Sequence, residues 1–152
     1  MSIINNGLAV ELFHYLSENI MQTPFYKTYG ISLLELGLGY SVFEITNKEA
    51  TNSSGFIHGG IQMTCADTAM GNAVRTYGYK TATIEQSSTF LRPTKSNSRI
   101  ICVGKVMEIG ESIFYTVGKL YSDDVLVMQN TATYFNLGKE KMIKKELDQS
   151  GQ

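Results

Sequence analysis

The sequence has little cysteine and almost no excess of charge. Its two cysteines, Cys65 and Cys102, are far apart, and a secreted domain built on disulfides would carry more. We therefore expect two free, buried thiols in a reducing compartment. The 13 basic and 14 acidic residues leave a net charge of −1 at pH 7, so the composition gives no sign of a nucleic-acid partner.

Long apolar runs and metal-binding clusters are also missing. No apolar segment approaches the roughly 20 residues needed to cross a membrane. The N-terminal residues lack the basic start and apolar run of a signal peptide. No Cys-x-x-Cys pair or His/Cys cluster indicates a metal site. These absences predict a cytoplasmic protein with no membrane segment and no metal.

The remaining composition is that of an ordinary globular protein. Hydrophobic residues make up 43% and charged residues 18% of a chain whose 152 residues fit one domain, 1–152. A core of this size is adequate but not generous, so burying apolar surface against a second subunit would add stability.

Hydrophobic spacing and turn residues divide the chain into helices and strands. Segment 7–22 has apolar residues at helical spacing, and Pro24 ends it. Segment 30–46 is rich in aromatic and β-branched residues and predicts two strands joined near Gly37–Gly39. The remaining sequence predicts a polar loop at 47–57 and a second helix at 59–77. Four strands follow at about 82–92, 98–108, 112–121 and 124–136, and a charged tail occupies 138–152.

This order of elements predicts an α+β fold of two layers. Consecutive strands joined by tight turns form an antiparallel sheet, and one long helix must bury its apolar stripe on that sheet. The helix at 59–77 contains small residues such as Ala66 and Ala69, so a curved sheet can wrap closely around it. The expected core spans about 30–136.

The residues His58-Gly59-Gly60 lead directly into this helix. The first amides of a helix lack an internal partner and can donate to an anion, and glycine lets a ligand approach the backbone. A carbonyl under acyl transfer becomes an oxyanion, for which the Gly59 N–H is a suitable donor. Losing one such donor typically costs about 2.7–4 kcal/mol of transition-state stabilisation. Taken alone, two glycines before a helix are as often a simple turn.

Asp67 lies seven residues after Gly60. Seven residues are about two helical turns, which puts both residues on the same face. Its neighbours are mostly apolar, and a carboxylate there is a poor choice for stability alone. Asp67 could act as a general base for water or as a direct nucleophile. A lone aspartate more often has a structural role than a catalytic one. The residues around Asp67 therefore have to show which role it has.

Two polar residues precede the helix. Asn52 could hold a water or orient a substrate, and His58 could donate to the carbonyl region or fix the loop. Taken alone, an Asn in a polar loop or a His at a helix cap is common and indicates no function. Their fixed spacing relative to Gly59 and Asp67 is what indicates a site.

These residues resemble the PaaI-type (phenylacetate-pathway) branch of the hot-dog thioesterase superfamily. That branch has an Asn, then six residues and a Gly within His-Gly-Gly, then an Asp eight residues after that Gly, matched here by Asn52, Gly59 and Asp67. The resemblance covers roughly 30–136 and includes the strand that ends in Ser88–Pro93. It implies a hot-dog fold, in which an antiparallel sheet wraps around one long central helix.

The resemblance also implies an activity and an assembly. The expected reaction is hydrolysis of acyl-CoA thioesters, with CoA as part of the substrate and no separate cofactor. The expected assembly is a homodimer with a continuous sheet, often paired again into a tetramer. At the subunit interface, Asp67 of one chain would attack or activate water. Gly59 of the other would polarise the carbonyl, while Asn52 and His58 would position the reacting groups.

Some relatives hold the water with a Ser or Thr on the strand after the helix. Thr83 stands near that position, with Thr81 and Ser87 as alternatives. Gly60 and Thr68 flank the reacting groups and are expected to contact the substrate.

Three basic residues surround a turn after a strand. Arg92, Lys95 and Arg99 could meet the phosphates of CoA. A solvated basic turn is the plainer interpretation of the same residues.

Two other classes of function compete with hydrolysis. A protein of this fold could bind or sense acyl-CoA without cleaving it, although Asp67 together with His-Gly-Gly argues for an enzyme. The chain has no room for an added DNA-binding module. A purely structural oligomer is the third class, and only exposed strand edges and an apolar sheet face support it.

Overall fold

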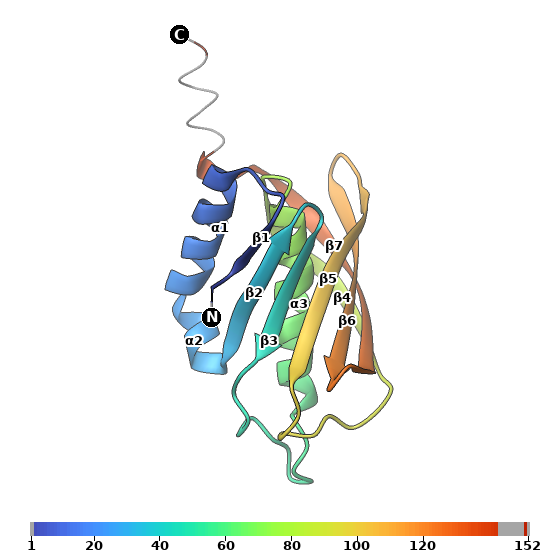
Figure 1. The fold of residues 1–152 in the computed structure, drawn as a ribbon. Helices are drawn as coiled ribbons and strands as arrows, with labels where there is room; N and C mark the ends of the chain where they lie inside the picture. Colours follow the sequence, from blue (N-terminus) through green and yellow to red (C-terminus); the bar gives the residue numbers. More distant parts are fainter. Residues whose placement is uncertain (1, 143–150, 152) are drawn as a thin grey trace.

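The computed structural model describes residues 2–142 and 151. It contains one seven-stranded sheet packed on a long helix (Figure 1). The elements are β1 (Ile4–Asn6), α1 (Val10–Gln22), α2 (Pro24–Tyr29), β2 (Ile31–Gly37), β3 (Tyr40–Ile45), α3 (Gly59–Arg75), β4 (Tyr79–Phe90), β5 (Ile100–Ile109), β6 (Ile113–Ser122) and β7 (Val125–Lys139). The strand order is β1-β2-β3-β5-β6-β7-β4. Every pair of neighbours is antiparallel except β1 with β2, so the predicted α+β architecture is confirmed.

The sheet approaches α3 at glycine positions. Ala66, Ala69 and Met70 on the helix are completely buried. Opposite them, a Cβ on Gly104 of β5 would lie 2.3 Å from the carbonyl carbon of Ala69. The close approach therefore requires small side chains on both sides. This confirms the expectation drawn from the alanine-rich helix.

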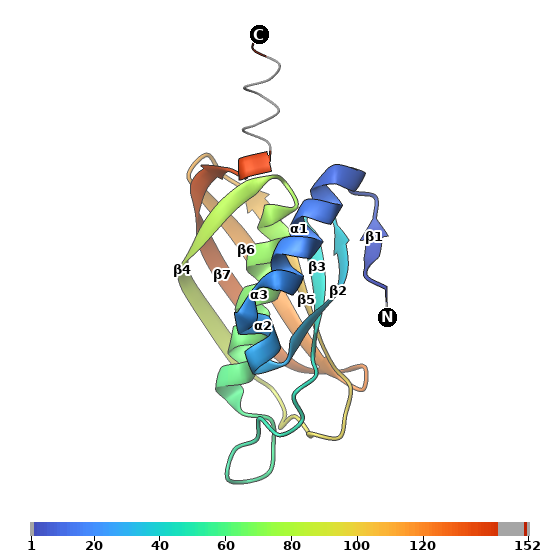
Figure 2. The same cartoon turned by 90° about the vertical axis from the view of Figure 1, so that its left-hand side faces the viewer.

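The N-terminal region differs from the predicted helix at 7–22. Ile4–Asn6 form a strand that pairs in parallel with β2, and α1 begins only at Val10. The Asn5 side chain accepts from the backbone N–H of Leu8 and donates to its carbonyl, which turns the chain between the two elements. Pro24 ends the first helix but also starts a second, because proline suits the first position of a helix. Figure 2 shows α1 and α2 on the same side of the sheet as α3.

The predicted charged tail at 138–152 begins as part of the folded domain. β7 continues to Lys139, and Glu140 is only 2% exposed. The Glu140 carboxylate accepts from Arg75 Nε at 2.7 Å and from the Tyr15 hydroxyl at 3.1 Å. These partners are far away in sequence, so the local pattern could not reveal them. Most of the remaining predicted tail lies outside the described residues.

β4 forms one edge of the sheet. It pairs with β7 on one side, and among the residues that the structure describes no strand pairs with its other edge. Large apolar side chains are exposed along it, with Ile84 52% and Phe90 47% exposed. An edge of this length with exposed apolar groups favours pairing with another strand. Among the described residues, no helix has the length and apolar character needed to cross a membrane.

Candidate active site

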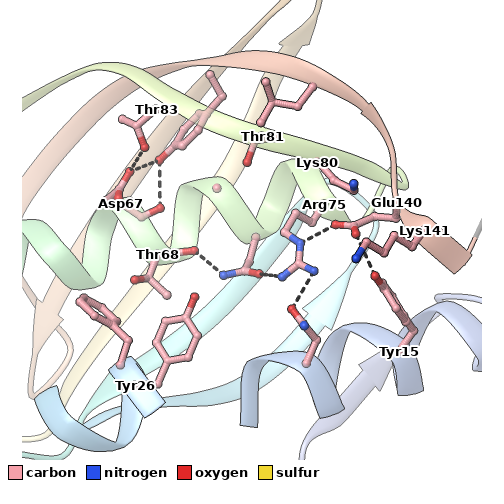
Figure 3. Close-up of a pocket in the computed structure, with 16 residues that line it drawn as sticks. Tyr15, Tyr26, Asp67, Thr68, Arg75, Lys80, Thr81, Thr83, Glu140 and Lys141 are labelled. Carbon is pink, nitrogen blue, oxygen red and sulfur yellow. Dashed lines mark hydrogen bonds and ion pairs between the residues drawn. The ribbon is translucent and has the colours of Figure 1, made fainter. Parts of the chain in front are cut away.

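Asp67 projects from the middle of α3 between two hydroxyl groups. Thr83 Oγ1 on β4 donates to Asp67 Oδ1 at 2.8 Å, and the Tyr134 hydroxyl on β7 lies 2.8 Å from the same oxygen (Figure 3). Among the residues described, Oδ2 has no hydrogen-bond donor. The carboxylate is half-buried and lines a cavity. One oxygen is thus fixed and the other is available for chemistry.

Tyr134 is the partner that the sequence did not reveal. Its side chain is 2% exposed, and its hydroxyl also lies 2.9 Å from the backbone carbonyl of Asp67. Burial, followed by the negative charge of Asp67, raises the pKa of Tyr134 far above its usual value. The phenol therefore keeps its proton and remains a donor throughout the working pH range. Alternation along β7 points Tyr134 inward, but only the sheet order brings it to Asp67.

The cavity beside Asp67 is a groove of about 620 Å³ that we call the Asp67 groove. It runs along α3 from Asp67 to Arg75, and α1, α2, β4 and the end of β7 form its other walls (Figure 3). The predicted residues Thr68 and Thr83 line it, as does Thr81. Among the alternatives for a hydroxyl on the strand after the helix, Thr83 is the one that bonds Asp67. Ser87 lines a different cavity.

A polar network closes the far end of the Asp67 groove. Arg75 donates through Nε to Glu140, through one terminal nitrogen to Asn72 at 3.2 Å, and through the other to Asn19 at 3.0 Å. Tyr15 donates to the second oxygen of Glu140. The network joins α1, α3 and the end of β7.

The start of α3 leaves one amide hydrogen unused. His58 is the N-cap, and its Nδ1 accepts the Gly60 N–H at 2.9 Å. The backbone N–H of His58 donates to the carbonyl of Ala50 at 2.8 Å. Within the described part of the chain, no acceptor takes the Gly59 N–H. Of the two glycines, Gly59 is therefore the one that can donate to a ligand, and His58 fixes the loop.

A second cavity, the Gly59 cavity, has a volume of about 470 Å³. Asn52, Phe90 and Arg92 line it together with Gly59. The side-chain carbonyl of Asn52 accepts from the backbone N–H groups of Ser54 and Phe56 at 3.0 and 3.1 Å. That oxygen stabilises the loop, and among the described residues the amide nitrogen of Asn52 has no acceptor.

The three cations predicted to meet the phosphates have different contacts. Arg92 lines the Gly59 cavity and donates to the carbonyl of Leu126 at 2.6 Å. Arg99 instead donates to Glu44 on β3 at 3.3 Å. Lys95 is exposed and does not line the Gly59 cavity. Of the three, Arg92 is the one that lines the same cavity as Gly59.

Asp67 and Gly59 do not meet within one chain. Eight residues of helix separate them by about 12 Å along the axis, and they line different cavities. A single reacting carbonyl therefore cannot contact both groups of the same chain.

The two cysteines are free and fully buried, on α3 and β5. The residues that the structure describes contain no cluster of three or more His, Cys, Asp or Glu side chains able to hold a metal ion. The groups described above at Asp67 and Gly59 are a carboxylate, two hydroxyls and a backbone amide.

Comparison with known proteins identifies a related family. Residues 54–129 match the profile of the thioesterase superfamily. The E. coli PaaI protein from the phenylacetic acid degradation operon is similar in structure, with a TM-score of 0.80 and 18% sequence identity over 88% of this chain and 98% of that one. No curated protein matches the sequence.

Two further solved structures are similar. A variant of the phenylacetic acid degradation protein PaaI from Thermus thermophilus gives a TM-score of 0.70 at 24% identity, covering 76% of this chain and all of that one (100%). A hypothetical thioesterase from Streptococcus pneumoniae, solved with coenzyme A, gives a TM-score of 0.68 at 21% identity, covering 73% of this chain and 91% of that one. At such identities the similarity shows a shared fold, and the predicted hot-dog fold is confirmed.

Proposed function

The chain belongs to the thioesterase superfamily, and from this premise we propose that it hydrolyses acyl-CoA thioesters to a free acid and CoA. The observation that carries the proposal is the Asp67 carboxylate, held at Oδ1 by Thr83 and Tyr134 with Oδ2 available beside a groove. CoA and acetyl-CoA in two streptococcal relatives support the choice of thioester. Two buried free thiols agree with a cytoplasmic location.

We propose that two copies pair through β4 and share their sites. Phe90, near the end of β4, lies against Gly59, where an added Cβ would be 3.2 Å from its ring. Thr83, seven residues earlier on the same strand, bonds Asp67. Antiparallel pairing about a two-fold axis between Gln86 and Ser87 would set Thr83 of one copy opposite Phe90 of the other. The axis would thereby bring Asp67 of one copy toward Gly59 of the other.

In this arrangement each group has a defined task. Water adds to the thioester carbonyl as Oδ2 of Asp67 removes its proton, or Oδ2 itself attacks the carbonyl and water then releases the acid. The Gly59 N–H of the second copy donates to the oxygen on which negative charge develops. In the first route the departing thiolate takes this proton back from Asp67 when the C–S bond breaks. In the second route the thiolate leaves as the acyl–Asp67 anhydride forms, and it is protonated when water cleaves that anhydride to the acid and the free carboxylate. Thr83 and Tyr134 hold the carboxylate in place throughout.

Gly59→Pro is expected to lower kcat by about 10²-fold, because it deletes the proposed oxyanion donor. Proline suits this site, since Gly59 is the first residue of α3 and His58 before it has φ −60° and ψ 133°. Gly59→Ala keeps the N–H while adding a Cβ near Phe90, and serves as the matched control. Steady-state kinetics on both variants measure the effect. Equal activity of the proline variant and the alanine variant would rule out this donor.

Co-expression of two inactive variants tests the shared site. A mixed dimer of Asp67→Asn and Gly59→Pro chains contains one site with both wild-type groups, so random pairing would restore roughly a quarter of the wild-type activity. Each variant expressed alone would stay inactive. If the mixture is as inactive as its parts, the two groups come from the same chain and the proposed dimer is wrong.

Tyr134→Phe is expected to lower kcat by about tenfold with a much smaller change in KM, because it removes one charge-assisted hydrogen bond to Asp67. Thr83→Val removes the other donor to the same oxygen. A double-mutant cycle on kcat should show coupling between the two. Tyr115→Phe, on the exposed face of β6, is the matched control. Strictly additive effects would mean that the two hydroxyls do not act together on the carboxylate.

A further inference from the structure

The far end of the Asp67 groove carries charge that the proposed hydrolysis does not use. Lys80 and Lys141 line it beside the Arg75–Glu140 pair (Figure 3). Glu140 is neutralised by Arg75. Among the described residues, neither lysine has an anionic partner within ion-pair distance. This end of the groove therefore has an excess of positive charge.

Arg75 also keeps unused donors. A guanidinium has five N–H groups, and three of them go to Glu140, Asn72 and Asn19. Within the described part of the chain, two N–H groups remain without an acceptor, at a side chain that is 17% exposed and lines the groove. Together with the Lys80 ammonium they match the oxygens of a carboxylate.

An alkyl chain fits this end poorly. It would remove the Lys80 ammonium and the free N–H groups of Arg75 from water and offer them no acceptor, which is costly for buried polar groups. Near the Asp67 end, Tyr26 of α2 lies beside Thr68 and supplies an aromatic wall (Figure 3). The groove thus changes from partly aromatic near the carboxylate to cationic at about 12 Å along α3.

We propose that the Asp67 groove binds the acyl part of the thioester and selects acyl groups that end in a carboxylate. The substrates would be CoA monothioesters of dicarboxylic acids long enough for the free carboxylate to reach Lys80 and Arg75. This inference rests on the proposed function, because it needs the scissile carbonyl to lie at Asp67.

The phosphates of CoA are the other source of anionic oxygens. Arg92 offers these phosphates a cation in a different place, because it lines the Gly59 cavity and not the Asp67 groove. With the thioester held between Asp67 of one copy and Gly59 of the other, the nucleotide leaves by the Gly59 cavity and the acyl group occupies the Asp67 groove. The charge at the far end therefore meets the acyl terminus.

Binding of thioethers that cannot be hydrolysed tests this assignment. Calorimetric titration would compare the affinity for an S-(ω-carboxyalkyl)-CoA with that for the S-alkyl-CoA of equal chain length. The same pair of thioethers built on pantetheine, which lacks the nucleotide, gives a second comparison. The wild-type protein is expected to bind the carboxylate form about tenfold or more tightly, on CoA and on pantetheine alike. Lys80→Met should remove most of that preference. Lys105→Met, an exposed lysine on β5, is the matched control and should retain it.

Two outcomes would overturn the proposal. Equal affinity for the carboxylate and alkyl forms in the wild-type protein would remove the selectivity. If Lys80→Met instead reduces the advantage of CoA over pantetheine and leaves the carboxylate preference intact, the groove belongs to the phosphates. Because the probes are not cleaved, a carboxylate preference can be measured even if no thioester is hydrolysed. Failure of the proposed hydrolysis would thus be distinguished from failure of the proposed carboxylate preference.

Discussion

Asp67→Asn is expected to lower kcat by about 10³-fold or more while leaving the fold intact. Asparagine has the same shape, and its carbonyl oxygen can still accept from Thr83 and Tyr134. What it lacks is an oxygen that can take a proton from water or attack a carbonyl, and such a group is typically worth 10²–10⁴-fold. The loss should therefore appear in turnover and not in stability.

The measurement is thiol release over a panel of acyl-CoA substrates, with thermal unfolding recorded beside it. Asp124→Asn is the matched control, because Asp124 has φ 64° in the turn between β6 and β7, a conformation that asparagine tolerates. Full activity in a well-folded Asp67→Asn protein would remove the mechanism. Tight binding of acyl-CoA by the wild-type protein without any thiol release would favour the non-catalytic binding protein considered from the sequence.

Gly104→Ala is expected to destabilise the fold by about 3 kcal/mol or more, at or above the usual cost of overpacking a core. The new Cβ would lie 2.3 Å from the carbonyl carbon of Ala69, 2.4 Å from its oxygen and 2.5 Å from the nitrogen of Met70. These are backbone atoms of α3, so no rotamer change can relieve the contact. Since domains are stable by only about 5–15 kcal/mol, little folded protein should remain at moderate temperature.

The matched control is Gly118→Ala on the neighbouring strand. Gly118 is the cross-strand partner of Gly104, but an added Cβ there would meet the flexible side chain of Met70 at 3.1 Å. Methionine can move aside, and alanine also reduces the entropy of the unfolded chain, so a change within about 1 kcal/mol is expected. Urea unfolding measures both variants. Similar midpoints for the two would show that β5 can move away from α3.

Much of the site could be predicted because its pattern is local in sequence. His58-Gly59-Gly60 and Asp67 belong to one helix and its cap, where spacing along the chain fixes position in space. The fold class could be predicted for the same reason, since alternating strands, turn residues and an alanine-rich helix are all short-range signals. The sequence also favoured Thr83, with Thr81 and Ser87 as alternatives, and the hydrogen bond from Thr83 to Asp67 appears only once β4 is placed against α3.

Tertiary structure decided the contacts between distant segments. Tyr134 reaches Asp67 across 67 residues, and Glu140 reaches Arg75 across 65, so no local pattern records either pair. The basic residues near 92–99 show the opposite case, because they are close in sequence yet Arg92 and Arg99 have different partners. The sequence by itself indicated most of the elements and the place of Asp67 on the long helix, since backbone periodicity governs both. The surroundings of that carboxylate, and the charged groove beyond it, were decided by the order in which the strands join the sheet.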